Sequence, residues 1–327
     1  MYSKVTGKYD AMTVGEVGVC SREETLKYIS AKEKEMNMLF MFDLVELGCV
    51  YGDKFRYTPF TTQQFKKVIG DQSDFIKGTD AWSTFFLENH DQPRCISRFG
   101  SDKPEFRTVS GKMLATLLVA STGTLFIYQG QEIGMVNLPR SWDIKEYLDI
   151  QSINYWAAFL ANNPNATEEE KSKLMDNINL LARDHARSPV QWDSSVNGGF
   201  STAGAKAQNP WMRINDNYKE INVANQTNDP DSVLGYYRKA LKVRKQYADP
   251  LVYGEFDHVD FENDDIMSFT KTGKQRKAYV VLNLKPKVVP FKILVDGDLK
   301  LILTNVDENE LKDDELKPFE ARIYLVQ

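Results

Sequence analysis

Residues 82–94 read WSTFFLENHDQPR, an apolar run that stops at Glu88 and passes into a dense polar segment. The run is short and rich in aromatic residues, which is typical of a buried strand. A helix-forming stretch, FRTVSGKMLATLLVAS, follows at 106–121, and a second apolar strand, TLFIYQG, follows at 124–130. Two apolar strands joined through a helix indicate a parallel βα unit.

The same alternation extends toward the N-terminus. A short apolar strand, AMTVGEV at 11–17, precedes a helix-forming stretch at 22–35 with acids at its start and lysines at its end. A second strand, MNMLFMFDLVEL at 36–47, precedes a helix that begins within 61–70, after Pro59. Strands that are buried on both faces and separated by helices are typical of a parallel sheet, so we predict an α/β fold.

Polar side chains follow each of the four predicted strands, at the point where the strand ends. They are Glu16, then Asp43 and Glu46, then Asn89, His90 and Asp91, and finally Gln131 and Glu132. The carboxyl ends of parallel strands meet at one edge of a sheet, where α/β proteins, and barrels in particular, build their active sites from successive loops. The sequence therefore predicts a pocket at this edge.

The chain beyond residue 131 is less regular. Helices are predicted at 152–163 and 168–186, and a long aromatic loop runs over 189–211. Loops of this length in compact proteins are more often functional than incidental, because binding residues concentrate in them.

A strong helix at 231–250, which Pro250 ends, separates two regions of different pattern. After it, short apolar strands alternate with turn residues to the last residue. The predicted domains are therefore an α/β domain at 1–250 and a small antiparallel β domain at 251–327.

Composition excludes several classes of function. The 327 residues are 42% hydrophobic, and the net charge of −5 comes from interspersed acids and bases, so nucleic acid is not an expected partner. No stretch has the roughly 20 apolar residues of a membrane span, and the first residues have no apolar signal core, so a cytoplasmic protein without a membrane partner is predicted. The three cysteines, Cys20, Cys49 and Cys95, are far apart and are expected to be reduced thiols. We expect no metal and no organic cofactor, because no ligand-type spacing occurs.

Two carboxyl groups suggest a chemistry. Glu16 lies in an apolar stretch, and partial desolvation there would disfavour the charged form, as suits a general acid. Asp91, beside His90 and near Arg94, would stay ionised. Carboxyl groups in contrasting surroundings on neighbouring strand ends suit glycoside hydrolysis, and we expect Glu16 and Asp91 to converge on one sugar-sized cavity.

Structural roles remain open for each of these residues. A glutamate at a strand end is often a solvated terminus or a hydrogen-bond acceptor, and the same holds for a lone histidine. Glu132 is predicted to tie down the loop after the fourth strand. The segment that contains Arg183, His185 and Arg187 is either a solvated helix end or a contributor to the pocket.

Six motifs resemble, in the same order, the α-glucosidases of glycoside hydrolase family 13, and they look closest to the fungal maltase and oligo-1,6-glucosidase branch. The motifs are MTVGEVG, FFLENHDQPRCISRFGSD, GTLFIYQGQEIGMVN, SWDIKEYLDIQSINYW, ARDHARSPVQW and NPWMRINDNYKEINV. The resemblance runs over nearly the whole chain and weakens in the predicted β domain.

The resemblance implies a role for several residues. Glu16 matches the general acid/base, and Asp91 matches the carboxylate that stabilises the transition state by binding sugar hydroxyls. The substrate-binding residues implied are His90, Arg56, Arg94 and Arg187. Asp43 has no role in this scheme.

The resemblance also implies an eight-stranded (β/α) barrel, of which this chain carries strands five to eight, the C-terminal half. The family's nucleophile, an aspartate on the fourth strand, has no matching motif in these residues. Retaining chemistry needs that carboxylate about 5–5.5 Å from the acid/base. We therefore expect no turnover by these residues alone, and a need for the N-terminal half-barrel, since half of a closed barrel also leaves unpaired edges.

The implied activity is hydrolysis of terminal α-linked glucose from maltose-type, isomaltose-type or sucrose-like substrates. Two alternatives stay open: a non-enzymatic relative that acts as a binding subunit, and a transglycosylating sugar isomerase on the same scaffold. The preference between α-1,4 and α-1,6 linkages is not readable from the chain.

Overall fold

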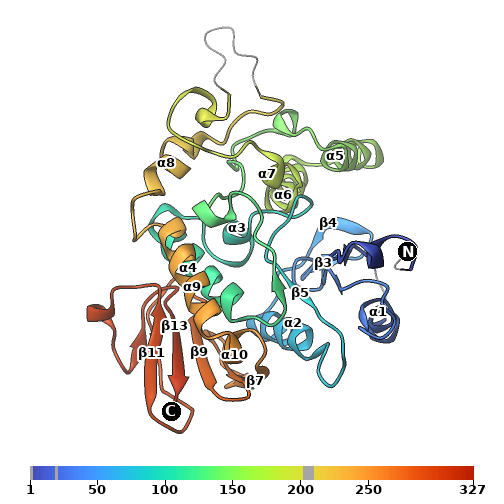
Figure 1. Cartoon of the computed structure of the whole chain (residues 1–327). Coiled ribbons are helices and arrows are strands. Elements are labelled where there is room, and N and C mark those ends of the chain that lie inside the picture. Colours follow the sequence, from blue (N-terminus) through green and yellow to red (C-terminus); the bar gives the residue numbers. More distant parts are fainter. Residues whose placement is uncertain (1–2, 19–20, 202–209) are drawn as a thin grey trace.

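The computed structural model describes residues 3–18, 21–201 and 210–327. The N-terminal third alternates short strands with helices (Figure 1). Its elements are η1 (Thr6–Lys8), β1 (Val14–Gly15), α1 (Arg22–Ile29), β2 (Met38–Leu39), β3 (Cys49–Val50), β4 (Asp53–Tyr57), α2 (Thr62–Asp74), β5 (Thr84–Phe85), α3 (Cys95–Phe99), α4 (Pro104–Ala120) and β6 (Thr124–Leu125).

The predicted parallel strands are present, but each is shorter than the apolar run that predicted it. β1 pairs with β2, and β5 pairs with β6, both in parallel. The two pairs meet where the Thr84 hydroxyl donates to the Leu39 carbonyl at 2.9 Å. Beyond two residues each strand leaves its ladder, because the chain turns into the polar loops. Along the second predicted strand, for example, the Glu46 amide bonds back to the Phe42 carbonyl.

The predicted helices occupy the predicted places, with ends set by local capping. Ser21 and Glu24 form a reciprocal capping box at the start of α1, and Thr61 and Gln64 form one at the start of α2. Helix α1 stops at Ile29, six residues before the predicted end. The chain beyond it turns back toward β2, so the lysines expected at the helix end lie in a turn.

Helix α4 is the centre of the core. Ten of its residues are buried, and it packs against α9 (Val233–Gln246). The carbonyls at its C-terminal end are satisfied by Arg244 of α9, which donates to the carbonyls of Val119, Ser121 and Gly123 at 2.7–2.8 Å. A cation on these carbonyls also complements the helix dipole.

The middle of the chain is helical and irregular. Its elements are η2 (Gln131–Ile133), η3 (Ile144–Glu146), α5 (Ile150–Asn162), α6 (Glu168–Leu181), α7 (Asp184–Arg187), η4 (Val196–Gly199), η5 (Asp216–Lys219) and α8 (Val223–Gln226). The helix predicted at 168–186 breaks at Ala182, whose extended backbone ends α6 and lets α7 start in a new direction. Residues 202–209, in the long aromatic loop, lie outside the described residues.

The β3–β4 hairpin was not predicted. It packs against α6, where Phe55 joins a second buried cluster with Leu174 and Ile178. Asn177 of α6 also donates to the Phe55 carbonyl at 3.0 Å. The sequence did not reveal the hairpin, because the strands β3 and β4 are too short and too polar to show a clear two-residue alternation of apolar and polar side chains.

The C-terminal region is antiparallel, as predicted. It follows α10 (Ala248–Leu251) and contains β7 (Glu255–Val259), β8 (Ile266–Thr272), β9 (Lys277–Asn283), β10 (Val289–Pro290), β11 (Leu299–Thr304), η6 (Glu308–Glu310), β12 (Glu315–Leu316) and β13 (Ala321–Val326). Five strands form one sheet in the order β11-β13-β9-β8-β7, and β10 pairs with β12. One face of the large sheet shares a continuous apolar core with α4 and α9.

Lys271 of β8 is buried in this shared core, where its ammonium bonds the Thr122 hydroxyl. Burial, together with the nearby Arg244 cation, lowers its pKa to about 7. The unfolded chain then holds a proton that the folded chain has released, so this residue makes stability rise between about pH 7 and pH 10.5.

We expect Lys271→Met to remove that rise, which is worth about 1.4 kcal/mol for each unit of pKa shift. Urea unfolding of both proteins at pH 6.5 and pH 9 measures the difference. A pH dependence that is the same in the two proteins would contradict the assignment to Lys271.

Candidate active site

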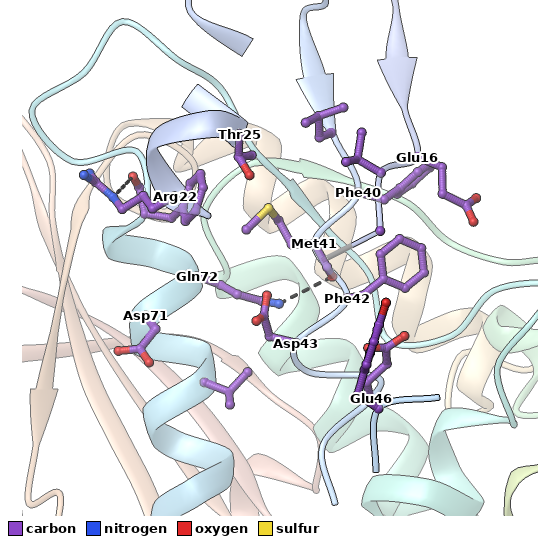
Figure 2. A pocket seen from close by; sticks show the side chains of 16 residues that line it. Glu16, Arg22, Thr25, Phe40, Met41, Phe42, Asp43, Glu46, Asp71 and Gln72 are labelled. Atoms are coloured by element: carbon purple, nitrogen blue, oxygen red, sulfur yellow. Dashed lines mark hydrogen bonds between the residues drawn. The ribbon is translucent and has the colours of Figure 1, made fainter. Parts of the chain in front are cut away.

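A pocket of about 430 Å³ lies at the carboxyl ends of β1 and β2 (Figure 2). Glu16 lines it immediately after β1, and Asp43 and Glu46 line it in the loop after β2. Phe40 and Phe42 supply apolar walls. The predicted gathering of polar side chains at this edge is therefore present for the first two strands.

Glu16 itself is exposed, and this corrects one expectation. The partial desolvation predicted from its apolar neighbours in sequence does not occur, because the strand ends at Gly15 and the side chain projects beyond it. Glu46, whose side chain is also exposed, has a raised pKa, because of partial desolvation and the neighbouring Asp43 carboxylate, while Lys54 lowers it.

Asp91 lies in a second cluster, made of charged groups from several elements. Its carboxylate accepts from Arg187 at 2.5 Å and lies 3.6 Å from Arg183. Arg187 also pairs with the buried Asp149 and donates from Nε to the carbonyl of His90 at 3.0 Å. The cations beside residue 91 are therefore Arg187 and Arg183, whereas the sequence had suggested Arg94.

Arg187 and Arg183 thus both lie beside the Asp91 carboxylate. Both belong to the short α7 segment, which the break at Ala182 turns toward the loop after β5. His185, between them, is completely buried, with Nδ1 accepting from the Leu138 amide at 3.1 Å. Burial lowers its pKa to about 3, so it packs as a neutral ring.

His90 and Arg56 are both exposed. The His90 imidazole lies 3.7 Å from the Asp91 carboxylate, on the accessible side of the cluster. Arg56 is on β4, the same strand as Lys54. These positions leave both side chains accessible to a ligand.

Arg94 differs from its expected role in substrate binding. Its side chain is fully buried, as is that of Glu88, with which it forms an ion pair at 2.8 Å. It also donates to the carbonyls of Gln129 and His185. A Cβ at Gly130 would lie 3.1 Å from the guanidinium, which shows how closely the chain wraps it. Arg94 therefore belongs to the buried core and does not face a ligand.

The sequence pattern did not identify Lys54 as a residue near the site. Lys54 extends from the unpredicted β3–β4 hairpin, and its ammonium donates to the main-chain carbonyl of Asp91 at 2.5 Å. The contact is visible only in the tertiary structure, because Lys54 and Asp91 are 37 residues apart in sequence.

Glu132 has the role that was predicted for it: its carboxylate accepts from the Gly130 amide at 2.8 Å and ties down the loop after β6.

The Glu16 pocket and the Asp91 cluster are neighbours but not one cavity in the described residues. Asp91 does not line the pocket. Phe86, just after β5 on the segment that leads to Asp91, contacts Phe40 and Phe42 of the pocket at centroid distances of 5.4 and 5.7 Å. The predicted convergence of Glu16 and Asp91 on one cavity stays a prediction.

The described ranges contain no group of three or more metal-type ligands. No helix among them is both long enough and apolar enough to cross a bilayer. Cys49 and Cys95 are free thiols, as predicted, and Cys20 lies outside the described residues. The cytoplasmic location stays a prediction from the sequence.

The catalytic-domain family of the alpha amylases matches residues 1–254. The chain belongs to the alpha-amylase family. An alpha-glucosidase of Candida albicans is 53% identical over 99% of this chain and 56% of its own length. An oligo-1,6-glucosidase of Saccharomyces cerevisiae is 38% identical over the whole chain and 56% of its own length. The chain thus spans about half the length of the curated relatives it matches.

Solved structures of alpha-amylase family enzymes superpose on nearly the whole chain. The isomaltulose synthase of Klebsiella sp. LX3 matches with a TM-score of 0.90 and 31% identity, over 99% of this chain and 57% of its own. An isomaltulose synthase variant from Erwinia rhapontici NX5, in complex with sucrose, matches with a TM-score of 0.89 and 33% identity, over 99% and 57%. The resemblance noted in the sequence is thereby confirmed at the level of the family.

Proposed function

We propose that this chain is the C-terminal part of a retaining α-glucosidase, made of the second half of a (β/α)8 barrel and the β domain. The observation that carries the proposal is the Asp91 carboxylate held between Arg187 and Arg183 at the carboxyl end of β5, next to a pocket that Glu16 lines. Relatives named alpha-glucosidase and oligo-1,6-glucosidase support the reaction class.

Each carboxyl group has a distinct task in this proposal. Glu16, exposed at the end of β1, donates a proton to the glycosidic oxygen and later accepts one from water. Asp91, which pairs with two arginines, accepts hydrogen bonds from sugar hydroxyls, and these bonds strengthen as the ring gains oxocarbenium character. His90 and Arg56, both accessible, are proposed to contact the same glucose unit.

The nucleophile is proposed to come from a segment of the complete protein outside these 327 residues. Its carboxylate would lie about 5–5.5 Å from that of Glu16 and form the covalent glycosyl intermediate. The substrates proposed are small α-glucosides with a terminal glucose, of the maltose, isomaltose or sucrose type. The reaction needs no metal or organic cofactor.

A direct test uses two proteins. The 327-residue chain alone is expected to release no glucose from maltose, isomaltose or an aryl α-glucoside. A chimera, in which the part of the Candida albicans relative that precedes the matched region is joined to this chain, is expected to release glucose. Glucose release from the chain alone that Glu16→Gln abolishes would contradict the proposed external nucleophile. An inactive but folded chimera would contradict the proposed function.

Transglycosylation is a second candidate, favoured by the superposition on isomaltulose synthases. In that case the glucosyl group passes to a sugar hydroxyl instead of water. Product analysis of the chimera with sucrose separates the two: free glucose and fructose indicate hydrolysis, and a disaccharide isomer indicates transfer.

A further inference from the structure

Lys54 occupies an unusual position for a lysine near the proposed site. It comes from the β3–β4 hairpin, outside the four parallel strands, and its ammonium lies against the Asp91 carbonyl at 2.5 Å. The main-chain N–H of Asp91 itself donates to the side-chain oxygen of Asn89 at 2.8 Å. The main chain of Asp91 is thus fixed at both its donor and its acceptor.

The hairpin does not need Lys54 in order to stay in place. Phe55 is buried in the cluster with α6, and its carbonyl accepts from Asn177. Two residues further along β4, the Tyr57 hydroxyl accepts from Arg98 at 3.0 Å, and the Tyr57 ring lies under the Arg98 guanidinium. A lysine that served only to anchor the hairpin would be redundant with these contacts.

The titratable groups around Lys54 come from five elements and their loops. Asp91 lies in the loop after β5, Asp149 at the start of α5 and Cys49 on β3, and all three favour the ammonium. Arg183, at the start of α7, opposes it. Glu46, in the loop after β2, also interacts with Lys54. Lys54 therefore lies between the two acidic regions of the proposed site.

We propose that Lys54 is a positioning residue for Asp91, which holds the main chain of the loop after β5 so that the carboxylate stays aimed at the sugar. The contact acts through the carbonyl of residue 91 and leaves the carboxylate to the arginines. This inference rests on the proposed function of Asp91.

Burial, with a smaller effect of Arg183, lowers the pKa of Lys54 to about 8. Two consequences of opposite sign follow. The charged contact weakens as the pH rises through about 8, so kcat/KM should fall. The folded chain meanwhile releases a proton that the unfolded chain keeps up to about pH 10.5, so the stability contribution of Lys54 rises over the same range. If Lys54 had only a structural role, kcat/KM would not fall with rising pH while the stability of the chain increased.

The experiment uses the chimera with Lys54→Met, Lys54→Arg and a matched control, Lys67→Met, an exposed lysine of α2 that pairs with Asp71. Lys54→Met is expected to lower kcat about 10-fold or more with a smaller change in KM, because orientation of a catalytic group is lost. Lys54→Arg should restore part of kcat and move the alkaline limb to higher pH, since a guanidinium stays charged. Lys67→Met should behave as the wild type.

Two readouts on the 327-residue chain do not depend on turnover. The amide NMR signal of Asp91 should titrate with a midpoint near pH 8 in the wild type and not in Lys54→Met. The Tm of Lys54→Met at pH 7 should equal or exceed that of the wild type, because a desolvated charge is removed.

Three results would overturn the proposal: a wild-type kcat for Lys54→Met in an active chimera, an unchanged alkaline limb in Lys54→Arg, or an Asp91 amide that does not titrate near pH 8. An inactive wild-type chimera would instead overturn the proposed function, and the NMR titration would still decide whether Lys54 holds the Asp91 loop.

Discussion

Arg94→Met is expected to lower the free energy of unfolding by about 3–5 kcal/mol, enough to unfold much of the chain at ambient temperature. The substitution leaves the Glu88 carboxylate buried without its cation, since both side chains are completely inaccessible. It also removes the donors to the carbonyls of Gln129 and His185. Urea denaturation followed by circular dichroism measures the change.

The double variant Glu88→Gln, Arg94→Met provides the matched test. Removing both charges avoids the unpaired carboxylate, so the double variant should be more stable than Arg94→Met alone. Arg140→Met, at an exposed ion pair with Asp176, should change stability by less than about 1 kcal/mol and serves as the control. If Arg94→Met were as stable as the wild type, the buried position of this pair would be wrong.

Asp91→Asn in the chimera is expected to lower kcat/KM about 10²–10³-fold. The amide keeps the shape of the side chain but loses the charge that Arg187 holds at 2.5 Å and that the developing positive charge of the sugar needs. Kinetics with an aryl α-glucoside measure the loss. Because Asp91 is partly exposed, the effect on stability should be much smaller than the effect on rate.

Asp176→Asn is the control for this prediction, because Asp176 is an exposed aspartate that also pairs with an arginine. It should leave kcat/KM unchanged. A wild-type rate for Asp91→Asn in an active chimera would remove Asp91 from the proposed mechanism. A loss of rate that parallels a large loss of stability would show instead that Asp91 is structural.

The alternation of strands and helices was readable from the sequence because apolar residues respond to burial with a period that differs between strand and helix. The helix at α4 is the clearest case, since ten of its seventeen residues are buried. Strand lengths were not readable. The apolar residues after Leu39 are partly buried and those after Phe85 are fully buried, but both lie beyond the strand pairs, and the rings of Phe40, Phe42 and Phe86 pack against one another at the pocket.

The sequence pattern predicted the polar residues of the site as a group, but it did not show which of them would be buried. Asp91 and Arg187, to both of which the resemblance gave a role in the site, meet across 96 residues. Arg94, only three residues from Asp91, points the other way into the core and pairs with Glu88. Neighbours in sequence can face opposite sides of a loop, and the residue types alone give no sign of which one will be buried.

The sequence by itself determined the α/β class, the change to antiparallel strands near residue 250, the polar edge at the strand ends and membership of the alpha-amylase family. These features depend on local periodicity and on motif order, which the chain carries one segment at a time. Only the tertiary structure decided that Arg94 is a core residue, that Glu16 is exposed and that Lys54 reaches Asp91. Burial and charge pairing are set by whatever packs against a side chain, and for these three residues the decisive neighbours lie outside the local pattern.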